Sequence, residues 1–306
     1  MNYEHVFDHL NILPEPFAVC ELNGSCDLGL GQDAAAVLHY VLSGEGMLEL
    51  KSCPDIPIKP GTLILVPALQ AHTLRSYGAR NDPIPDCKPA ELQLQHLLKP
   101  SQDDGAEGQL IALCAHIRVG LRGAENVVDL IRSPLVENIC ENNPLHATLR
   151  ALLHEIGTPT TGSRAMIQAL LTQCMIEILR RRLNEDDSGL RWMAALRDPQ
   201  VWDALRAMLD APGDPHTVDS LAERVGMSRS TFANRFSAAY GSGPIDLLRD
   251  LRLRKAAVLL RDTNTPVKRI AHLVGFSSRT AFSRLFEQRI GESPQQFRKT
   301  QLEKLR

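Results

Sequence analysis

The sequence predicts an α+β protein with a β-rich N-terminal part, a helical middle segment and an all-α C-terminal part. Three observations lead to this prediction. Short apolar runs separated by turn residues fill about residues 20–119, which is typical of a β-sandwich or barrel. After about residue 120, apolar residues recur at helical spacing. Near the C-terminus one helical pattern occurs twice, beginning at Leu221 and at Ile270.

We expect domain boundaries that follow these three changes of pattern. The parts are predicted to span residues 1–119, 120–196 and 197–306. The two copies of the repeated pattern are placed at about 217–240 and 266–290.

The composition is that of an ordinary globular protein. The 306 residues are 43% hydrophobic and 23% charged, and the length allows two or three domains. The N-terminus lacks the pattern of a signal peptide, and no window approaches the ~18 consecutive apolar residues of a membrane span, so a cytoplasmic protein is expected. The seven cysteines are scattered and contain no CxxC pair. We therefore expect mostly free thiols rather than a disulfide framework or a zinc ribbon.

The charge is distributed unevenly along the chain. Residues 215–306 contain 17 Lys and Arg against 8 Asp and Glu, whereas the rest contains 17 and 28. A basic C-terminal third on an acidic body indicates a polyanionic partner for that end, although a solvated basic face gives the same count.

Three sequence stretches carry the strand prediction. "AAAVLHYVLSGEGMLEL" gives two strands around a turn at residues 43–46, and "IPIKPGTLILVPALQAHTL" contains a buried strand from Thr62 to Val66. "GQLIALCAHIRVG" gives a further strand, while the breaker-rich stretches 76–91 and 99–108 are expected to be loops.

Helices are expected from Pro144 to Ile156, from Thr161 to Leu183 and from Asp198 to Leu209, with "APGDPH" as a linker. The second helix carries one long apolar stripe, for which core packing and a dimer seam both remain open. The stripe consists of Met166, Leu170, Leu171, Cys174, Met175, Ile178 and Leu179.

The first copy of the repeat predicts two helices joined by a tight turn. Ala222 is small enough for a second helix to cross closely, and Gly226 suits a turn that requires positive φ. Ser228 is expected to cap the second helix, which Phe232 and Phe236 anchor to the core.

The second copy repeats each element. Ala271 is the small residue, Gly275 the turn, Ser277 or Ser278 the cap, and Phe282 and Phe286 the anchors. Since an α-helix fits the major groove of DNA, this helix-turn-helix pattern favours DNA reading. A helical hairpin without a nucleic-acid partner is the alternative.

A long helix from Pro244 separates the two copies and carries several basic residues. Such a rigid spacer is expected to hold both second helices on one side of the duplex, about one turn of ~10 bp apart. Its basic residues are expected to contact phosphates and not bases.

The C-terminal hundred residues closely resemble the DNA-binding domain of AraC/XylS-type transcription regulators. The match includes the spacer helix, "GFSSRTAFSRLF" and the closing "IGESPQQFR". By position, the resemblance implies base contacts from Ser230, Ala233, Asn234, Arg279, Thr280, Ser283 and Arg284. Expected phosphate contacts are Arg229, Arg235, Arg252, Arg254, Lys255 and Arg298.

The N-terminal part resembles the two motifs of the cupin barrel, in "VLHYVLSGEGMLEL" and "KPGTLILVPALQAHTL". His72 matches the metal-binding histidine of the second motif, but the HxH pair and Glu of the first motif are missing. We therefore expect no metal and no cofactor, and His39 and His72 are expected to line a sensor pocket or to be hydrogen-bonded core residues.

The order of cupin, helices and tandem reader resembles an AraC subgroup that includes sensors of reactive chlorine, which act through cysteines. Cys20 and Cys114 match by position, although Cys26 could replace Cys20. His116 lies two residues after Cys114 on the same strand face and is expected to favour the thiolate. An inert small thiol, and a small ligand bound in the barrel, are the alternatives.

Together these patterns predict a sequence-specific transcription regulator, not an enzyme, with activation favoured over repression by the resemblance. The expected partners are a double-stranded DNA operator, RNA polymerase, a second copy of the chain, and an oxidant or small-molecule effector. The rival functions are a cupin metalloenzyme fused to a DNA-binding domain and a nucleoid-type binder without sequence preference.

Overall fold

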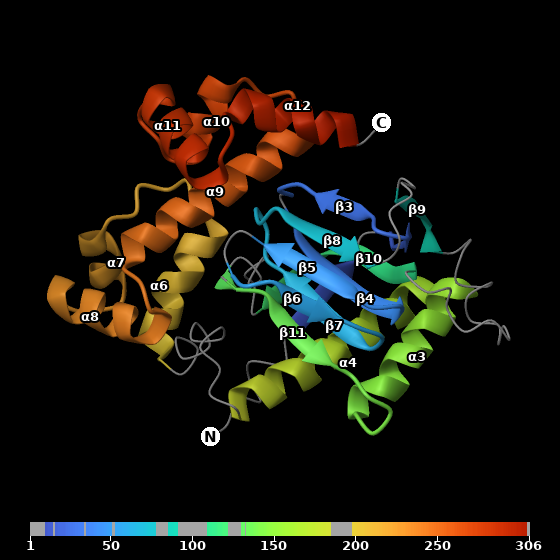
Figure 1. Cartoon of the computed structure of the whole chain (residues 1–306). Coiled ribbons are helices and arrows are strands. Elements are labelled where there is room, and N and C mark those ends of the chain that lie inside the picture. The colour runs from blue at the N-terminus through green and yellow to red at the C-terminus, as the bar shows by residue number, and fades with distance from the viewer. Residues whose placement is uncertain are drawn as a thin grey trace, which may run out of the picture. The chain divides into compact units, whose positions relative to one another are not determined.

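The computed structural model describes residues 10–14, 16–33, 35–50, 53–77, 85–90, 109–121, 130–131, 133–184 and 198–304. The chain divides into two compact units (Figure 1). The first contains the described strands with helices α3 and α4, and the second contains helices α6 to α12 together with Leu130 and Ile131. The expected middle segment therefore does not stand apart, because its two described helices belong to the same unit as the strands.

The β part of the first unit is built from two sheets. The larger sheet has the strand order β11-β7-β4-β10-β2-β9, with β1 also paired to β10, and the smaller has the order β3-β8-β5-β6. The strands of the larger sheet are β1 Leu10–Pro14, β2 Ala18–Asn23, β4 Ala36–Ser43, β7 Thr62–Val66, β9 Asp86–Pro89, β10 Gln109–Leu121 and β11 Leu135–Asn138. Those of the smaller sheet are β3 Asp27–Leu30, β5 Gly46–Leu50, β6 Ile56–Ile58 and β8 His72–Ser76.

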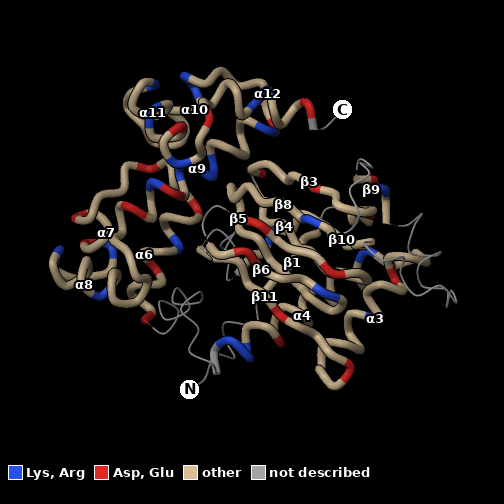
Figure 2. The backbone as a smooth tube through the Cα atoms, in the orientation of Figure 1, with Lys and Arg blue, Asp and Glu red and all other residues tan. Residues whose placement is uncertain are grey.

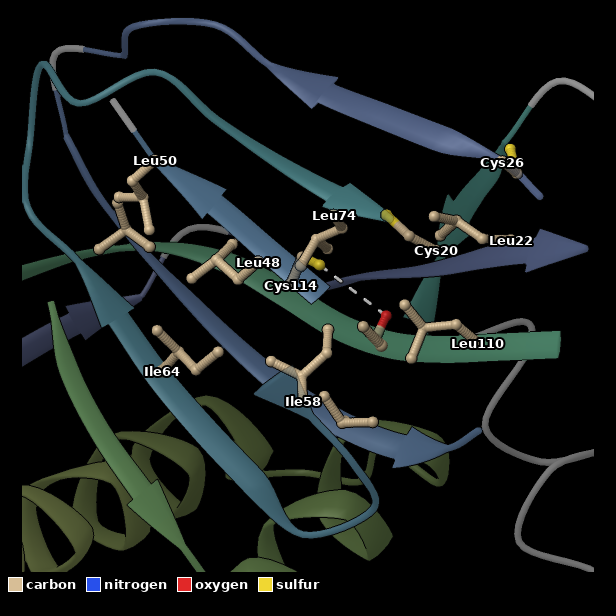
Figure 3. Close-up of a cluster of buried hydrophobic side chains, with 13 residues drawn as sticks. Cys20, Leu22, Cys26, Leu48, Leu50, Ile58, Ile64, Leu74, Leu110 and Cys114 are labelled. Atoms are coloured by element: carbon tan, nitrogen blue, oxygen red, sulfur yellow. Dashed lines mark hydrogen bonds between the residues drawn. The ribbon is translucent and has the colours of Figure 1, made fainter. Parts of the chain in front are cut away.

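The two sheets enclose one apolar core (Figure 3). Leu48 and Leu74 come from the smaller sheet and Leu22, Ile64 and Leu110 from the larger, and each is 0% exposed. Since side chains alternate along a strand, Leu110, Ala112 and Cys114 of β10 share the face that borders this core. The expected β-barrel or sandwich is confirmed.

Helices α3 (Pro144–Gly157) and α4 (Ser163–Asn184) pack against each other, and α4 also packs on β1. Most of the apolar stripe of α4 lies inside this unit, where Leu171, Cys174 and Met175 are buried. Met166, at the start of the stripe, is 51% exposed. Core packing therefore accounts for the buried part of the stripe, and a dimer seam stays a prediction for the rest.

The Arg-rich end of α4 is bound to the larger sheet. Glu137 of β11 is buried and accepts hydrogen bonds from Arg181 at 2.9 Å and from Arg182 at 2.6 Å. Arg182 also donates to the carbonyl of Val136, and Arg181 donates to Asn143, the N-cap of α3. The buried carboxylate thus connects the sheet to α4, and Arg181 connects α4 to the N-cap of α3.

The second unit is entirely helical in its described residues. Asp198 caps α6 by accepting from the amides of Gln200 and Val201. The loop "APGDPH" that follows α6 was expected to be a linker, but it packs inside this unit. The helices are α6 Pro199–Asp210, α7 Val218–Arg224, α8 Arg229–Tyr240, α9 Pro244–Asp262, α10 Val267–Leu273, α11 Arg279–Ile290 and α12 Pro294–Lys304.

The structure corrects two details of the strand prediction. Strand β9 lies within the stretch 76–91 that was expected to be a loop, and strand β1 begins before the predicted β region. Both are short and contain proline, which weakens their strand signal. The second expected loop, 99–108, lies outside the described residues. None of the described helices is long and apolar enough to span a membrane.

Replacing Glu137 with Gln is expected to destabilise the first unit by about 3–5 kcal/mol, because Arg181 and Arg182 then lose a buried counter-charge. Urea unfolding of the purified variant measures this change. Glu177→Gln is the matched control, since Glu177 pairs with Arg180 on the helix surface, and a loss below about 1 kcal/mol is expected. Equal stability of the two variants would contradict the bridging role of Glu137.

Candidate DNA interface and sensor site

The first helix-turn-helix consists of α7 and α8. The turn contains Gly226 at φ +66°, and Ser228 caps α8 by accepting from the amide of Thr231. Phe232 and Phe236 are 0% exposed, with their ring centroids 5.6 Å apart. The expected turn, cap and anchors are all confirmed.

The second helix-turn-helix consists of α10 and α11 and has the same construction. Gly275 has φ +83°, and the cap of α11 is Ser278, which accepts from the amide of Ala281. Phe282 and Phe286 are 0% exposed, and Phe286 also packs edge-on against Phe297 of α12. The closing α12 therefore completes the core beneath α11.

The candidate reading helices are α8 and α11, the second helix of each motif. Because the phenylalanines fix the inner face of each of these helices, the outer face is also determined. All seven candidate base-reading residues lie there: Ser230, Asn234, Arg279, Thr280 and Arg284 are exposed, and Ala233 and Ser283 are half-buried. In the described part of the chain, the side chains of Arg279 and Arg284 form no hydrogen bond or ion pair.

The six candidate phosphate-binding residues lie on helices α8, α9 and α12, where Figure 2 marks Lys and Arg in blue, and they have different partners. Three of them are bound within the second unit: Arg235 pairs with Asp198 at 2.6 Å, Arg252 donates to two loop carbonyls, and Arg298 donates to the carbonyls of Leu260 and Thr265. Arg229 forms an exposed pair with Asp219, Arg254 is half-buried, and Lys255 is exposed.

Inside the barrel, Cys114, His39 and His72 form one hydrogen-bonded chain. The Nδ1 atom of His39 lies 3.0 Å from the Cys114 sulfur, and its Nε2 atom lies 2.8 Å from Nε2 of His72. Nδ1 of His72 lies 3.1 Å from the carbonyl oxygen of Gln70. All three side chains are buried, although His72 also borders a cleft of about 550 Å³ that Glu49 and Asp55 help to line.

The carbonyl oxygen of Gln70, at one end of this series of hydrogen bonds, determines which atom donates in each bond. Gln70 O can only accept, so Nδ1 of His72 donates, and Nε2 of a neutral His72 must accept. Nε2 of His39 therefore donates, and its Nδ1 accepts from the Cys114 thiol. Every ring nitrogen is thus satisfied with both histidines neutral. A weaker contact joins the Cys114 sulfur to the carbonyl of Ala112 at 3.8 Å (Figure 3).

The second cysteine candidate, Cys20, has a different partner. Strands β2 and β9 pair with Cys20 directly opposite Cys87, and the two residues form a disulfide with a Cα–Cα distance of 4.1 Å. Cys20 is 3% exposed, whereas Cys87 is exposed on its strand. The expectation of mostly free thiols is confirmed, since the other five cysteines are free, and this pair is the exception.

Two family models match the chain. A model described as a cupin covers residues 4–184, and one described as a helix-turn-helix domain covers residues 221–300. The chain belongs to the AraC-type transcription regulators with an N-terminal cupin domain. The resemblance on which the sequence prediction rested is therefore confirmed, and with it the fold class.

Relatives of this AraC-type regulator match over nearly their full length. The HTH-type transcriptional regulator AlkR of Acinetobacter baylyi is 26% identical, covering 96% of this chain and 97% of AlkR. The RCS-specific HTH-type transcriptional activator RclR of Escherichia coli is 25% identical, covering 91% of this chain and 90% of RclR. The fold is similar to ToxT from Vibrio cholerae, with a TM-score of 0.52 at 12% identity, covering 94% of this chain and 98% of ToxT. AlkR and RclR are both transcriptional regulators.

Many cupins hold a metal ion, but the residues of this regulator do not fit one. The Nε2 atoms of His39 and His72 meet in a hydrogen bond, and their other ring nitrogens are bound to Cys114 and Gln70. Among the described residues, no group of three His, Cys, Asp or Glu side chains could hold a metal ion. A metal would have to replace this network without a third ligand.

Burial controls the protonation of the regulator's barrel site. It raises the pKa of the Cys114 thiol to about 12, which is opposite to the lowered pKa that His116 was expected to produce. His116 instead pairs with Asp33 at 3.3 Å. Burial, and then the neighbouring His72 and His116, hold the pKa of His39 well below its usual range.

Sequence reasoning missed Cys87 and the hydrogen bond between His39 and Cys114. Both depend on strand pairing: β2 with β9, and β4 with β10, where His39 lies opposite Cys114. The available signal was Cys87 itself, the one cysteine in the stretch 76–91, which was interpreted as a loop.

The neutral state of His39 predicts a pH dependence of stability. Its pKa is depressed in the folded protein, so below about pH 6.5 the unfolded chain binds the extra proton and stability falls as the pH falls. Between pH 7.5 and 5.5 the wild type should lose about 1.4 kcal/mol more than His39→Gln. Urea unfolding at both pH values measures this difference, and equal losses would show that His39 is not held neutral.

Proposed function

We propose that this regulator binds one operator with both reading helices. In this proposal Ser230, Ala233 and Asn234 of α8 read one major-groove segment. Arg279, Thr280, Ser283 and Arg284 of α11 read the next. The observation that carries the proposal is the exposure of these residues on helices whose opposite faces are fully buried.

The second reader supplies the stronger base discrimination. Arg279 and Arg284 can each donate two hydrogen bonds to the edge of a guanine. In the first reader only Asn234 can make two hydrogen bonds to one base, an adenine, whereas Ser230 and Ala233 allow single hydrogen bonds, methyl contacts and water-mediated contacts. Sequence preference should therefore concentrate on the half-site bound by α11.

We assign phosphate binding to the exposed candidates Arg229 and Lys255 and to the half-buried Arg254. The ion pair of Arg229 with Asp219 joins two well-exposed side chains, so water already screens it and a phosphate can replace the carboxylate. Arg235, Arg252 and Arg298 act mainly within the unit, because their guanidinium groups are already bonded there.

The proposed signal is oxidation of Cys20 and Cys87. Their opposed positions on β2 and β9 place the two sulfurs within bonding reach, and the exposure of Cys87 gives a solvent-borne oxidant access to the pair. The similarity to the RCS-specific activator RclR agrees with such a signal. Cys114 is assigned no redox role, because its buried thiol donates to His39.

The reaction is a two-electron oxidation of two thiols. With hypochlorous acid, the Cys87 thiolate takes the chlorine and releases hydroxide, and the Cys20 thiolate then displaces chloride to form the S–S bond. The two thiols lose two protons and two electrons, and the oxidant leaves as chloride and water. The new bond ties β9 covalently to β2, and reduction releases it.

Two protein partners are also proposed. Activation through RNA polymerase is supported by the similarity to RclR, which is a transcriptional activator. A homodimer is supported by the exposed start of the α4 stripe at Met166, and sedimentation of the purified protein tests it.

A small-molecule effector is the second candidate signal, favoured by the cleft beside His72. Its lining includes the carboxylates of Glu49 and Asp55, so a ligand there would carry hydrogen-bond donors or positive charge. Such a ligand should change DNA binding without any oxidant, and it should still act on the Cys87→Ser variant.

Arg279→Ala should cost about 1–3 kcal/mol of binding free energy on the preferred operator, and base preference should relax at one position. Operator selection followed by competition binding measures both effects. The matched control is Arg206→Ala, which removes an exposed arginine of α6 outside the readers and should leave the preference unchanged. Unaltered specificity of Arg279→Ala would exclude this contact.

Cys87→Ser and Cys20→Ser should both abolish the change in operator binding that equimolar hypochlorous acid causes in the wild type. Each variant leaves one sulfur without a partner, so the disulfide cannot form. Cys140→Ser removes an exposed thiol outside the pair and should respond like the wild type. Cys114→Ser should also keep the response. An oxidant response that persists in Cys87→Ser would rule out the pair as the sensor.

A further inference from the structure

Arg252, in the spacer helix α9, lies between two parts of the second unit that belong to different helix-turn-helix motifs. Its Nε atom donates to the carbonyl of Pro212 and its Nη2 atom to the carbonyl of Asp214, both at 2.8 Å. Its Cζ atom lies 5.9 Å from the ring centroid of Phe276, in the turn of the second motif. One guanidinium group therefore contacts the loop 211–216 and that turn together.

The loop and the turn approach each other too closely for side chains. A Cβ atom on Gly213 would lie 2.1 Å from the carbonyl oxygen of Leu273. A Cβ atom on Gly275 would lie 2.7 Å from the carbonyl oxygen of Gly213 and 2.8 Å from Cζ of Arg252. Two glycines and one arginine thus form a closely packed joint between the motifs.

One side of this joint leads into the first helix-turn-helix motif, and the other contacts the reading helix of the second. The loop 211–216 ends at Thr217, which caps α7 of the first motif. On the other side, Phe276 packs on Phe282 of α11, with ring centroids 5.4 Å apart. A displacement of Arg252 would therefore change the positions of residues in both motifs.

The environment of Arg252 favours this internal role over a phosphate contact. Burial, together with repulsion from Arg249, lowers its pKa, so the guanidinium has already lost part of its hydration. Within the described residues no carboxylate pairs with it, and two carbonyls and an aromatic face replace the lost water.

We propose that Arg252 is a positioning residue that fixes the distance between the two reading helices, and with it the half-site spacing that the operator must have. This inference rests on the proposed function, in which both helices read one duplex. The residue touches neither base nor phosphate in this role, and acts through the loop 211–216 and Phe276.

The experiment compares wild type and Arg252→Lys on the operator selected by the wild type and on versions with 1 bp inserted or removed between the half-sites. One base pair turns the second half-site by about 34°, so the wild type should lose roughly tenfold or more in affinity. Lysine keeps the charge but cannot bind both carbonyls and stack on the ring. The variant should bind the selected operator roughly tenfold more weakly than the wild type does. Relative to its own affinity for that operator, its affinity for the altered spacings should fall by less than about threefold.

Salt dependence separates this role from a phosphate contact. Arg252→Gln should keep the wild-type slope of log affinity against log salt, whereas Lys255→Gln, at an exposed position of the same helix, should lower the slope by about 0.9. A lowered slope for Arg252→Gln with unchanged spacing preference would overturn the proposal. So would an unchanged spacing preference in Arg252→Lys.

Two further outcomes remain informative. If a variant at Arg252 does not fold, Phe276→Leu removes the stacking partner and should broaden the spacing preference in the same way; a preference identical to wild type would then overturn the proposal. If the wild type selects no operator, or tolerates every spacing, the two-reader function itself fails before any variant is measured.

Discussion

The buried phenylalanine pair in each reading helix is the contact on which the DNA-binding unit depends. Phe232 and Phe236 in one helix, and Phe282 and Phe286 in the other, are completely enclosed. A ring buried in this way contributes about 3–5 kcal/mol, and the four-residue spacing puts both rings of a pair on one face. The inward face is therefore fixed by packing, and the polar residues between the rings can only face outward. The face that α8 and α11 would present to DNA is therefore determined by the packing of the core.

The DNA-binding unit was predictable from sequence because its signals are local. A small residue, a turn glycine with positive φ, a serine cap and two phenylalanines all lie within about sixteen residues of each other. The sensor chemistry was not predictable in this way. Cys20 and Cys87 are 67 residues apart, and Cys114 and His39 are 75 residues apart. Each pair meets only through strand pairing, which residue composition does not reveal. The missing HxH pair, by contrast, already argued against a metal, and the hydrogen-bonded histidines explain why none fits.

The excess of basic residues in the C-terminal third indicated a polyanionic partner for that part. It could not show which of the arginines would contact this partner. A guanidinium has five donors, and carbonyls or carboxylates of the same fold can use them as readily as a phosphate can. Arg235 and Arg298 are bonded in this way, and in the first unit Arg181 and Arg182 enclose Glu137. Only the donor geometry separates arginines that hold the fold together from those that remain available to DNA.

Asp198 connects two helices through its single carboxylate. One oxygen caps α6 by accepting from the amides of Gln200 and Val201, and the other accepts from Arg235 in the first reading helix. A backbone rotation at this position would turn the carboxylate and shift the end of α6 and the side of α8 in a single movement. The position of α8, the helix with the weaker base-reading chemistry, is thus coupled to the start of α6 through this carboxylate.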